Sequence, residues 1–413
     1  MLLDSSFFSL LLISIIRVAS LCGALNDTSR SDPTMSMAAA GPIVQDRAFT
    51  VVWNIPTLRC EKRYGIHLGL KDFDILENHR HSFKGQNVSI FYYNQLGLYP
   101  YISQEGMEVN GGVPQKGDMQ AHLALAETQI SGLLRPHFNG LASIDWEEWR
   151  PLWVRDFGMK HKYKQLSKRL VRREHPELTK QEVNNLARKE FESGARAFMS
   201  ETLRLGVCLR PRGLWGFYGY PECFNNYLKQ KGEYTGHCHP KTKQKNDHLA
   251  WLWRQSTGLY PSIYLPLHLA GSSDATNMVR YRLIEALRVA KQYPSTRTHA
   301  TPVLPYARLA FAHTLQFLNK RQCEILRDYV HFELGVYIRT LKSGVQRCSE
   351  DRCHGNGRCA RRDSYTDYMI PLSNPLLDPS IDHSYLRGNF LCQCYQGWVG
   401  EECQERIALI SST

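Results

Sequence analysis

The feature that most constrains the fold is an alternation of short strand-like runs with longer helical stretches between Phe49 and about Phe311. The clearest helix follows Thr179 and Glu182, which form a capping box at its start. Strands that alternate with helices over this length favour a parallel sheet, and a closed TIM-like β/α barrel is its most economical form. The strand-like runs lie at 50–52, 88–92, 142–145, 213–219, 262–265 and 302–309.

One strand-like run ends in two acidic residues. Alternate residues of an extended strand point to the same face, so Asp145 and Glu147 project together while Trp146 and Glu148 point away. Each carboxylate raises the pKa of the other, so one keeps its proton near neutrality while the other is ionised. A glycosidase needs such a proton donor for its leaving oxygen, and barrel enzymes place such residues at the C-terminal ends of strands.

Two tyrosines also occupy strand-end positions. Tyr218 follows the run at 213–219, and Tyr264 lies between two prolines in the segment LYPSIYLP. Taken alone, each tyrosine is more often a packed amphipathic side chain than a catalytic group. Rigid aromatic rings with a polar tip are nevertheless the usual platform for sugar rings. For Glu148, a pairing with Arg150 or a place at a helix start is the simpler interpretation.

The composition changes after Cys348, where six cysteines gather in a short segment that ends in CQCYQGWVGEEC. This spacing is typical of an EGF-like module that three disulfides hold together, because such a domain is too small for a sufficient core. A zinc site is the alternative, and an exported chain makes it less favoured. We place the barrel at 49–345, the module at 346–405 and a tail at 406–413.

The N-terminus has the features of a secretory signal. An apolar run at 7–16 is too short to cross a bilayer and precedes small residues, which predicts a signal peptide at 1–24 and an extension at 25–48. The basic segment that usually opens a signal is missing. Twelve cysteines agree with an oxidising compartment, so we expect a secreted or lysosomal protein. Asn26 and Asn87 begin possible glycosylation motifs.

The formal net charge of +12 narrows the classes of partner. Basic clusters at 160–173 and 241–245 are usually solvated surfaces. For an exported protein a nucleic-acid partner is improbable, and an acidic polysaccharide is the more natural polyanion. No segment after the N-terminal run is long and apolar enough to be a transmembrane span.

Several separate motifs carry a resemblance to one family. They are VVWNIPTLRC, FYYNQLGLYPY, IDWEEWRPLW, LRPRGLWGFYGYPEC, LYPSIYLP, PVLPYARL, CHGNGRCARR and CQCYQGWVGEEC, and they span roughly 49–403. With these residues the chain resembles the animal hyaluronidases. The resemblance implies an endo-β-N-acetylglucosaminidase that acts on hyaluronan, with chondroitin as a further candidate substrate. It also implies a monomer with no cofactor and no metal.

The resemblance assigns roles by position. Glu147 matches the general acid/base, and Asp145 matches the neighbour that shares a proton with it and orients the substrate's acetamido group. Tyr218 and Tyr264 match residues that contact that group and the ring. The implied mechanism is substrate-assisted retention, in which the acetamido oxygen attacks the anomeric carbon. Further positions in the cleft are implied to bind substrate: Tyr92, Arg282 and Tyr306.

The resemblance also pairs ten of the twelve cysteines. The implied bridges are Cys60–Cys323, Cys223–Cys238, Cys348–Cys359, Cys353–Cys392 and Cys394–Cys403. Cys22 then falls in the signal, and Cys208 is left as a buried free thiol. His237, Cys238 and His239 could suggest a metal site, but a disulfide at Cys238 argues against it.

The chain departs from the family pattern after 302–311. There the family has another barrel helix, then a strand that ends in a cleft tryptophan. Here only 11 residues, Ala312 to Gln322, precede Cys323, and no tryptophan occurs between Trp253 and Trp398. A helix and a strand need about 20 residues or more, so we expect this unit to be absent and the barrel to be incomplete. Its loss would expose two strand edges.

Three functions follow from these features. The first is a hyaluronan-degrading enzyme. The second is a protein whose cleft binds a glycosaminoglycan without turning it over, because part of the barrel is missing. The third is adhesion through the EGF-like module alone.

Overall fold

The computed structural model describes residues 44–79, 85–225, 234–295, 300–309, 319–372 and 383–407. The predicted signal at 1–24, Asn26 and most of the segment from Ala312 to Gln322 lie outside these ranges. The structural findings below concern the described residues.

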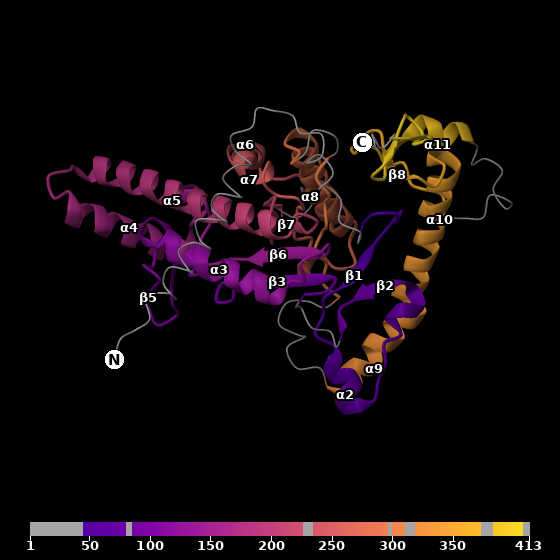
Figure 1. The fold of residues 1–413 in the computed structure, drawn as a ribbon, viewed down its shortest axis with the longest axis horizontal. Coiled ribbons are helices and arrows are strands. Elements are labelled where there is room, and N and C mark those ends of the chain that lie inside the picture. Colours follow the sequence, from indigo (N-terminus) through magenta and orange to yellow (C-terminus); the bar gives the residue numbers. More distant parts are fainter. Residues whose placement is uncertain are drawn as a thin grey trace, which may run out of the picture.

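A parallel three-stranded sheet lies at the centre of the molecule (Figure 1). Its order is β3 (Val88–Tyr92), β6 (Leu141–Asp145) and β7 (Leu214–Phe217), and all but the last residues of β3 and β6 are buried. Near-complete burial is expected of parallel strands that are covered on both faces. The register pairs Tyr92 with Asp145, so the C-terminal ends of β3 and β6 lie side by side.

The sheet continues past β7 through single parallel bridges. Tyr218 pairs with Tyr260, Leu259 with Val303 and Ser262 with Tyr306. The runs at 262–265 and 302–309 therefore lie where strands were predicted but form isolated bridges rather than full ladders. β1 (Val51–Trp53) and β2 (Ile75–Glu77) form a separate parallel pair.

Alternate residues of these strands meet in one interior cluster. It contains Val88, Ile90, Leu141, Leu214 and Tyr260, and partly buried side chains pack against it from β1, β2 and the 303–306 segment. The other faces of β3, β6 and β7 pack outward into a larger cluster with the helices. A shared interior with helices outside is the arrangement of a β/α barrel.

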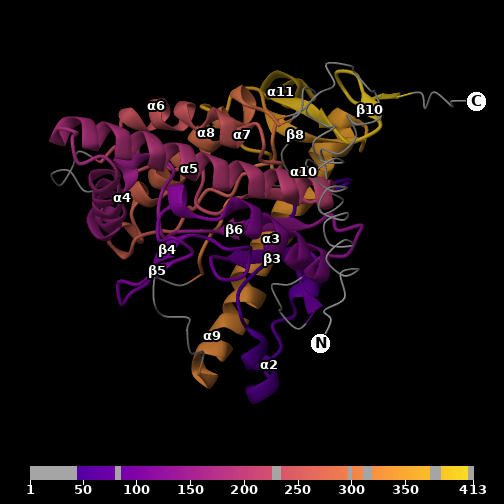
Figure 2. The same ribbon diagram turned by 60° about the vertical axis from the view of Figure 1, so that its left-hand side comes forward.

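Long helices cover the outer face of the central sheet (Figures 1 and 2). α5 (Lys180–Leu209) begins at the predicted capping box, which is confirmed: Thr179 Oγ1 accepts from the Glu182 amide, and the Glu182 carboxylate accepts from the Thr179 amide. α4 (His161–Glu174) packs beside it as a hairpin, and α3 (Met119–Leu133) begins at Asp118, which caps it.

The remaining elements surround this centre. The helices are α2 (Leu58–Tyr64), α6 (Lys241–His248), α7 (Ala250–Trp253), α8 (Ser273–Gln292), α9 (Lys320–Tyr329) and α10 (Gly335–Cys353), with a π-helical turn at Val330–Leu334. Short 3-10 turns lie at Leu70–Phe73, Pro114–Lys116, Trp153–Arg155, Gly158–Lys160 and Leu267–Leu269, and a small hairpin is formed by β4 (Tyr101–Ile102) and β5 (Glu108–Val109).

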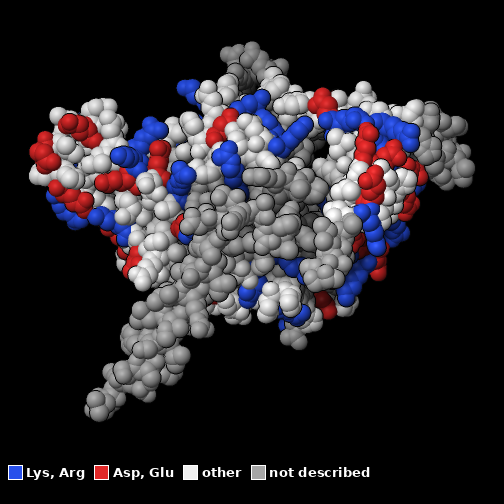
Figure 3. All heavy atoms as spheres, turned by 45° about the horizontal axis from the view of Figure 1, so that its top comes forward, with Lys and Arg blue, Asp and Glu red and all other residues white. Residues whose placement is uncertain are grey.

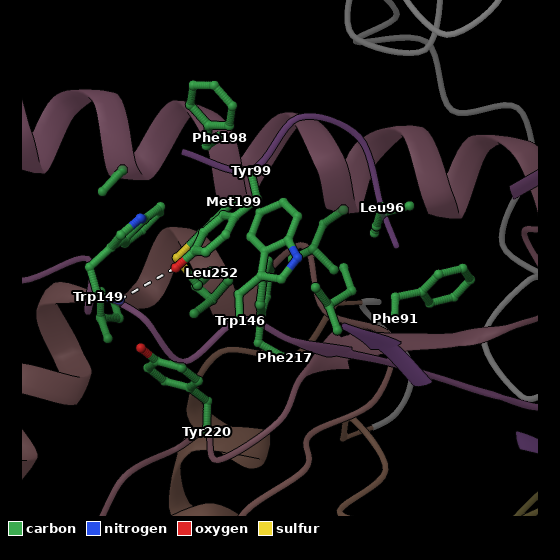
Figure 4. Packing of buried hydrophobic residues seen from close by; sticks show 14 of the residues in the cluster. Phe91, Leu96, Tyr99, Trp146, Trp149, Phe198, Met199, Phe217, Tyr220 and Leu252 are labelled. Atoms are coloured by element: carbon green, nitrogen blue, oxygen red, sulfur yellow. Dashed lines mark hydrogen bonds between the residues drawn. The ribbon is translucent and has the colours of Figure 1, made fainter. Parts of the chain in front are cut away.

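An aromatic cluster supports the end of β6 from behind (Figure 4). The Tyr99 ring lies 4.6 Å from the ring of Trp146 and 5.1 Å from that of Trp149. Phe217 of β7 meets Trp146 edge to face at 5.5 Å. Large rings packed in this way fix the course of the chain just beyond the strand.

The five predicted disulfides are confirmed: Cys60–Cys323, Cys223–Cys238, Cys348–Cys359, Cys353–Cys392 and Cys394–Cys403. The first joins α2 to α9 across 263 residues of sequence. The prediction that Cys208 is a buried free thiol is wrong. Cys208 is half-buried and disulfide-bonded. An apolar helix face therefore misled the prediction, because burial alone does not distinguish a free thiol from a bonded one.

A small disulfide-bonded module follows the barrel (Figure 1). It contains the antiparallel pairs β8 (Gly357–Arg361) with β9 (Phe390–Cys394) and β10 (Trp398–Val399) with β11 (Glu405–Arg406), together with α11 (His383–Asn389). α10 runs without interruption through the predicted boundary at 346 and carries the first two cysteines of the module. No helix in the described ranges is long and apolar enough to cross a membrane.

Candidate active site

The two acidic residues of IDWEEW lie at the C-terminal end of the central sheet. Asp145 is the last residue of β6 and is half-buried, and the side chain of Glu147 is 58% exposed. Trp146 points the other way and is 4% exposed within the aromatic cluster. The predicted alternation is confirmed, and the core behind β6 holds the carboxylates toward the open side.

The environment of Asp145 favours its protonated form. Burial, followed by the nearby charge of Glu147, raises the pKa of Asp145 to about 7, and Arg150 opposes this shift. Asp145 Oδ1 is buried without a hydrogen-bond partner among the described residues. The expectation that one member of the pair keeps its proton near neutrality is therefore met at Asp145.

Arg150 connects Glu147 to the rest of the site. Its Nη2 lies 3.9 Å from Glu147 Oε1, and its Nε donates to Glu222 Oε1 at 2.8 Å. Arg155 pairs with the second oxygen of Glu222. The loop after β7 thus holds Arg150 in place. Sequence reasoning missed this role of Glu222, since its segment is 72 residues away from Arg150.

Lys160 approaches the same residues from the start of α4. Its ammonium group donates to the backbone carbonyl oxygens of Glu147 and Glu148. The Glu148 carboxylate instead accepts from the Tyr163 hydroxyl at 3.4 Å, so the expectation that it pairs with Arg150 is wrong. Glu148 faces away from Glu147, as the strand alternation predicted.

Three predicted tyrosines form a wall beside the carboxylates. Tyr218 follows β7, and its ring centroid lies 6.1 Å from that of Tyr264 and 5.1 Å from that of Tyr306. Burial raises the pKa of Tyr218, and its hydrogen bond with Tyr264 adds to this. Burial also raises the pKa of Tyr306. These phenols therefore remain protonated donors at neutral pH.

The remaining predicted residues complete the same edge. Tyr92, at the end of β3, has its pKa raised by burial and then by the charge of Asp145 across the strand pair. Arg282 of α8 donates from Nε to Asn225 Oδ1 at 2.8 Å and from Nη1 to the Ser262 carbonyl at 2.7 Å. The structure thus brings all seven predicted site residues together, from strands and a helix that are far apart in sequence.

Arg308 is a residue of this edge that sequence reasoning did not single out. Its guanidinium carbon lies 3.9 Å from the centroid of the Tyr264 ring, a cation–π contact. The signal was present in the motif PVLPYARL, where Arg308 stands two residues after Tyr306. No acidic residue beside Arg308 in the sequence suggested a role for it.

Two further predictions concern sites outside the cleft. Within the described ranges no group of three or more His, Cys, Asp or Glu side chains could hold a metal, and Cys238 is bonded to Cys223. Asn87, a predicted glycosylation site just before β3, is partly buried, and its side-chain nitrogen donates to the Glu77 carbonyl at 2.8 Å.

Comparison with known proteins identifies the family. The sequence profile of the hyaluronidase family matches residues 38–322 and 318–407. The chain is 41% identical to hyaluronidase-3 of Sus scrofa over 403 aligned positions, which cover 90% of this chain and 94% of that protein. This chain belongs to the hyaluronidase family. It is also 37% identical to hyaluronidase-1 of Bos taurus, over 90% of this chain and 92% of that protein.

A solved hyaluronidase has the same fold. The crystal structure of bee venom hyaluronidase in complex with a hyaluronic acid tetramer superposes with a TM-score of 0.63 at 30% identity, and covers 70% of this chain and 98% of that one. The chain is therefore a TIM-barrel-like glycoside hydrolase of hyaluronidase type. The hyaluronidase profile matches this chain in two pieces that overlap at residues 318–322.

Proposed function

We propose that this hyaluronidase-family chain hydrolyses β-1,4 N-acetylglucosaminidic bonds in hyaluronan, with Glu147 as the general acid/base. The observation that carries the proposal is the Asp145–Glu147 pair at the end of β6, enclosed by Tyr92, Tyr218 and Tyr264. The hyaluronic acid tetramer in the bee venom relative supports the choice of substrate. Chondroitin, which also alternates uronate and N-acetylhexosamine units, is a candidate second substrate.

The spacing of the carboxylates favours a substrate-assisted retaining mechanism. Asp145 ends β6 and Glu147 follows two residues later, so both carboxylates lie at the same strand end, whereas a carboxylate nucleophile would have to lie on the face of the sugar opposite the acid. We infer that the acetamido oxygen of the substrate attacks its own anomeric carbon while Glu147 protonates the departing oxygen. Glu147 then removes a proton from the water that opens the cyclic intermediate, and this returns the enzyme to its starting state.

The neighbours of Glu147 have supporting roles in this scheme. Asp145, whose pKa burial raises to about 7, shares a proton with Glu147 and orients the acetamido group. The phenols of Tyr218 and Tyr264 contact that group and the ring. Tyr92, Tyr306 and Arg282 line the cleft around the substrate. Electrostatic groups that are fixed before the reaction need no reorganisation when charge develops.

We also propose that the chain lacks one barrel helix–strand unit near 318–322. The two-piece profile match supports this. The alignment with pig hyaluronidase-3 supports it as well, because it has 403 positions but covers only 90% of this 413-residue chain, so some of those positions are gaps in this chain. The C-terminal module is proposed to be EGF-like, because its cysteines pair first with third, second with fourth and fifth with sixth. We further propose a monomer that is exported by its N-terminal signal and is secreted or lysosomal.

The decisive experiment measures reducing ends released from hyaluronan by the full chain and by Glu147→Gln. We expect release by the parent chain and a loss of at least about 100-fold in kcat for the variant, the size typical of general acid/base catalysis. Glu148→Gln, a neighbour that faces Tyr163, is the matched control and should retain activity. Equal activity of Glu147→Gln and the parent would overturn the assignment.

The same variant separates catalysis from a second function, the binding of a glycosaminoglycan without turnover. If the parent chain retains hyaluronan on an affinity column but releases no reducing ends, the protein is a glycosaminoglycan-binding member of the family. Comparing retention of the parent chain and Glu147→Gln separates binding from turnover, because the substitution removes the acid and leaves the tyrosine wall intact.

A further inference from the structure

We propose that Arg308 selects a substrate with carboxylate groups, by binding a uronate carboxylate of the sugar next to the one held at Asp145 and Glu147. This inference rests on the proposed function, because it assumes that a polysaccharide lies in the cleft. It assigns a specificity role to a residue that the motif analysis did not single out.

Three cations near the carboxylate pair already donate hydrogen bonds to protein acceptors. Arg150 is paired with Glu222, Lys160 donates to the carbonyl oxygens of Glu147 and Glu148, and Arg282 donates to Asn225 and Ser262. Each of these cations already has protein acceptors.

Arg308 differs from these three cations. It is exposed, and its contact within the described part of the chain is the face of the Tyr264 ring. A guanidinium that lies on an aromatic face keeps its N–H edges available. Arg308 thus differs from the other three cations because, in the described part of the chain, its guanidinium donates no hydrogen bond to the protein.

The register of the segment at 303–308 indicates the direction in which the Arg308 side chain points. Leu304 and Tyr306 pack against the interior cluster, and Tyr306 pairs with Ser262. Alternate residues of an extended segment point to the same side, so Arg308 continues the row that Leu304 and Tyr306 begin. Its stacking on Tyr264 agrees with this direction. Arg308 thus stands above the tyrosine wall at the mouth of the barrel.

The charges of the site and of the substrate also favour a cation at this position. The ionised form of the Asp145–Glu147 pair repels any carboxylate on the substrate. In hyaluronan an uronate follows each N-acetylglucosamine, so the ring beside the one at Glu147 carries a negative charge. A cation is needed near that ring, and the planar fork of an arginine binds a carboxylate through two parallel hydrogen bonds. The Tyr264 ring holds the fork in place before the substrate arrives.

Charge that is spread over the molecular surface does not supply the same selectivity. On the face shown in Figure 3, Lys and Arg side chains lie among Asp and Glu rather than in one continuous basic field. Screening over about 8–10 Å at physiological ionic strength also weakens distant charges. A cation in direct contact is required to recognise one carboxylate.

The test compares hyaluronan with carboxyl-reduced hyaluronan, in which each uronate carboxylate is replaced by a neutral hydroxymethyl group. Dissociation constants of oligosaccharides of both kinds are measured on the Glu147→Gln background, with and without Arg308→Gln. We expect Arg308→Gln to weaken binding of the acidic oligosaccharide about tenfold or more, the size of a charge-assisted hydrogen bond, and to leave the neutral one within about twofold. The affinity of Arg308→Lys for the acidic oligosaccharide should lie between those of Arg308 and Arg308→Gln, because lysine keeps the charge but loses the planar pair of donors.

A matched control is Arg339→Gln, which removes an exposed arginine that stacks on Phe73 in the same way. It should change neither affinity. Equal weakening of both oligosaccharides by Arg308→Gln would overturn the proposal, since Arg308 would then act only by positioning Tyr264. No change with either ligand would overturn it as well. Because binding is read without turnover, these outcomes are distinct from an inactive parent chain, which would bear on the proposed function instead.

Discussion

The two sides of the barrel are built very differently. On one side, β3, β6 and β7 form continuous ladders, and the largest cluster of buried aromatic and aliphatic side chains packs behind them. On the other side, the segments at 259–262 and 303–306 are joined by single bridges. In sequence, that second side precedes 318–322, where the two pieces of the family profile match overlap.

The difference matters because the site draws on both sides. Asp145 and Glu147 extend from the well-packed side, where Trp146 and Trp149 fix the chain beyond β6. Tyr264, Tyr306 and Arg308 extend from the side whose ladder is interrupted, where four backbone hydrogen bonds join 259–263 to 302–306. The acid thus follows a continuous ladder, whereas half of the wall that meets the substrate follows interrupted ones. Three experiments would break or sharpen this contrast.

The largest expected effect is on stability. Trp146→Ala removes a 4%-exposed indole from the aromatic cluster, and we expect it to lower the free energy of unfolding by about 3–5 kcal/mol. Val303→Ala shortens a half-buried side chain on the side formed by 259–262 and 303–306, called the bridged side below. It should lower the free energy of unfolding by roughly 1 kcal/mol. Urea unfolding of both variants measures the contrast. Equal losses would show that the two sides contribute alike.

The next effect is local. Insertion of a barrel helix–strand unit of about 20–30 residues at 318–322 should supply a neighbour for the bridged side. We expect the backbone amides at 303–306 to exchange hydrogen at least about tenfold more slowly, while those of β6 change little. A flexible glycine–serine insert of the same length is the control. If it slows exchange equally, the missing unit is not what weakens this side.

The smallest effect concerns pH. Burial and Glu147 raise the pKa of Asp145 to about 7, from an ordinary value of 3.8. Between about pH 4 and 7 the folded protein therefore holds a proton that the unfolded chain releases, so stability from this group falls as the pH rises through that window. Asp145→Asn should raise the melting temperature at pH 7 more than at pH 4.5. Part of the decrease in stability with rising pH should persist in this variant, because burial also raises the pKa of Asp156 to about 7. Equal shifts at both pH values would contradict the burial of this charge.

Much of the fold could be predicted from local pattern. The strands at 88–92 and 142–145, the capping box at Thr179 and the alternation of Asp145, Trp146 and Glu147 depend on neighbours in sequence, and local geometry fixes them. The bridged segments were predicted less well. Whether 262–265 and 302–309 form full ladders depends on the partners they meet, which periodicity does not reveal.

The site shows the same division. Its carboxylates and tyrosines could be named because they stand at strand ends in recognisable motifs. The contacts of Glu222 with Arg150, of Lys160 with the Glu147 carbonyl and of Arg308 with Tyr264 could not, because each joins segments that only folding brings together. The prediction for Cys208 failed for a similar reason, because the helix face that carries a cysteine does not reveal whether that cysteine is disulfide-bonded.

The sequence by itself determined the residue types, their alternation along β6 and the family to which their motifs belong, since these follow from covalent order and local geometry. Only the tertiary structure decided that burial raises the pKa of Asp145, which cations donate to protein acceptors and which cation instead lies on an aromatic ring. The physical reason is that pKa values and hydrogen bonding depend on burial and on charges a few ångströms away, and those neighbours are set by packing between distant segments.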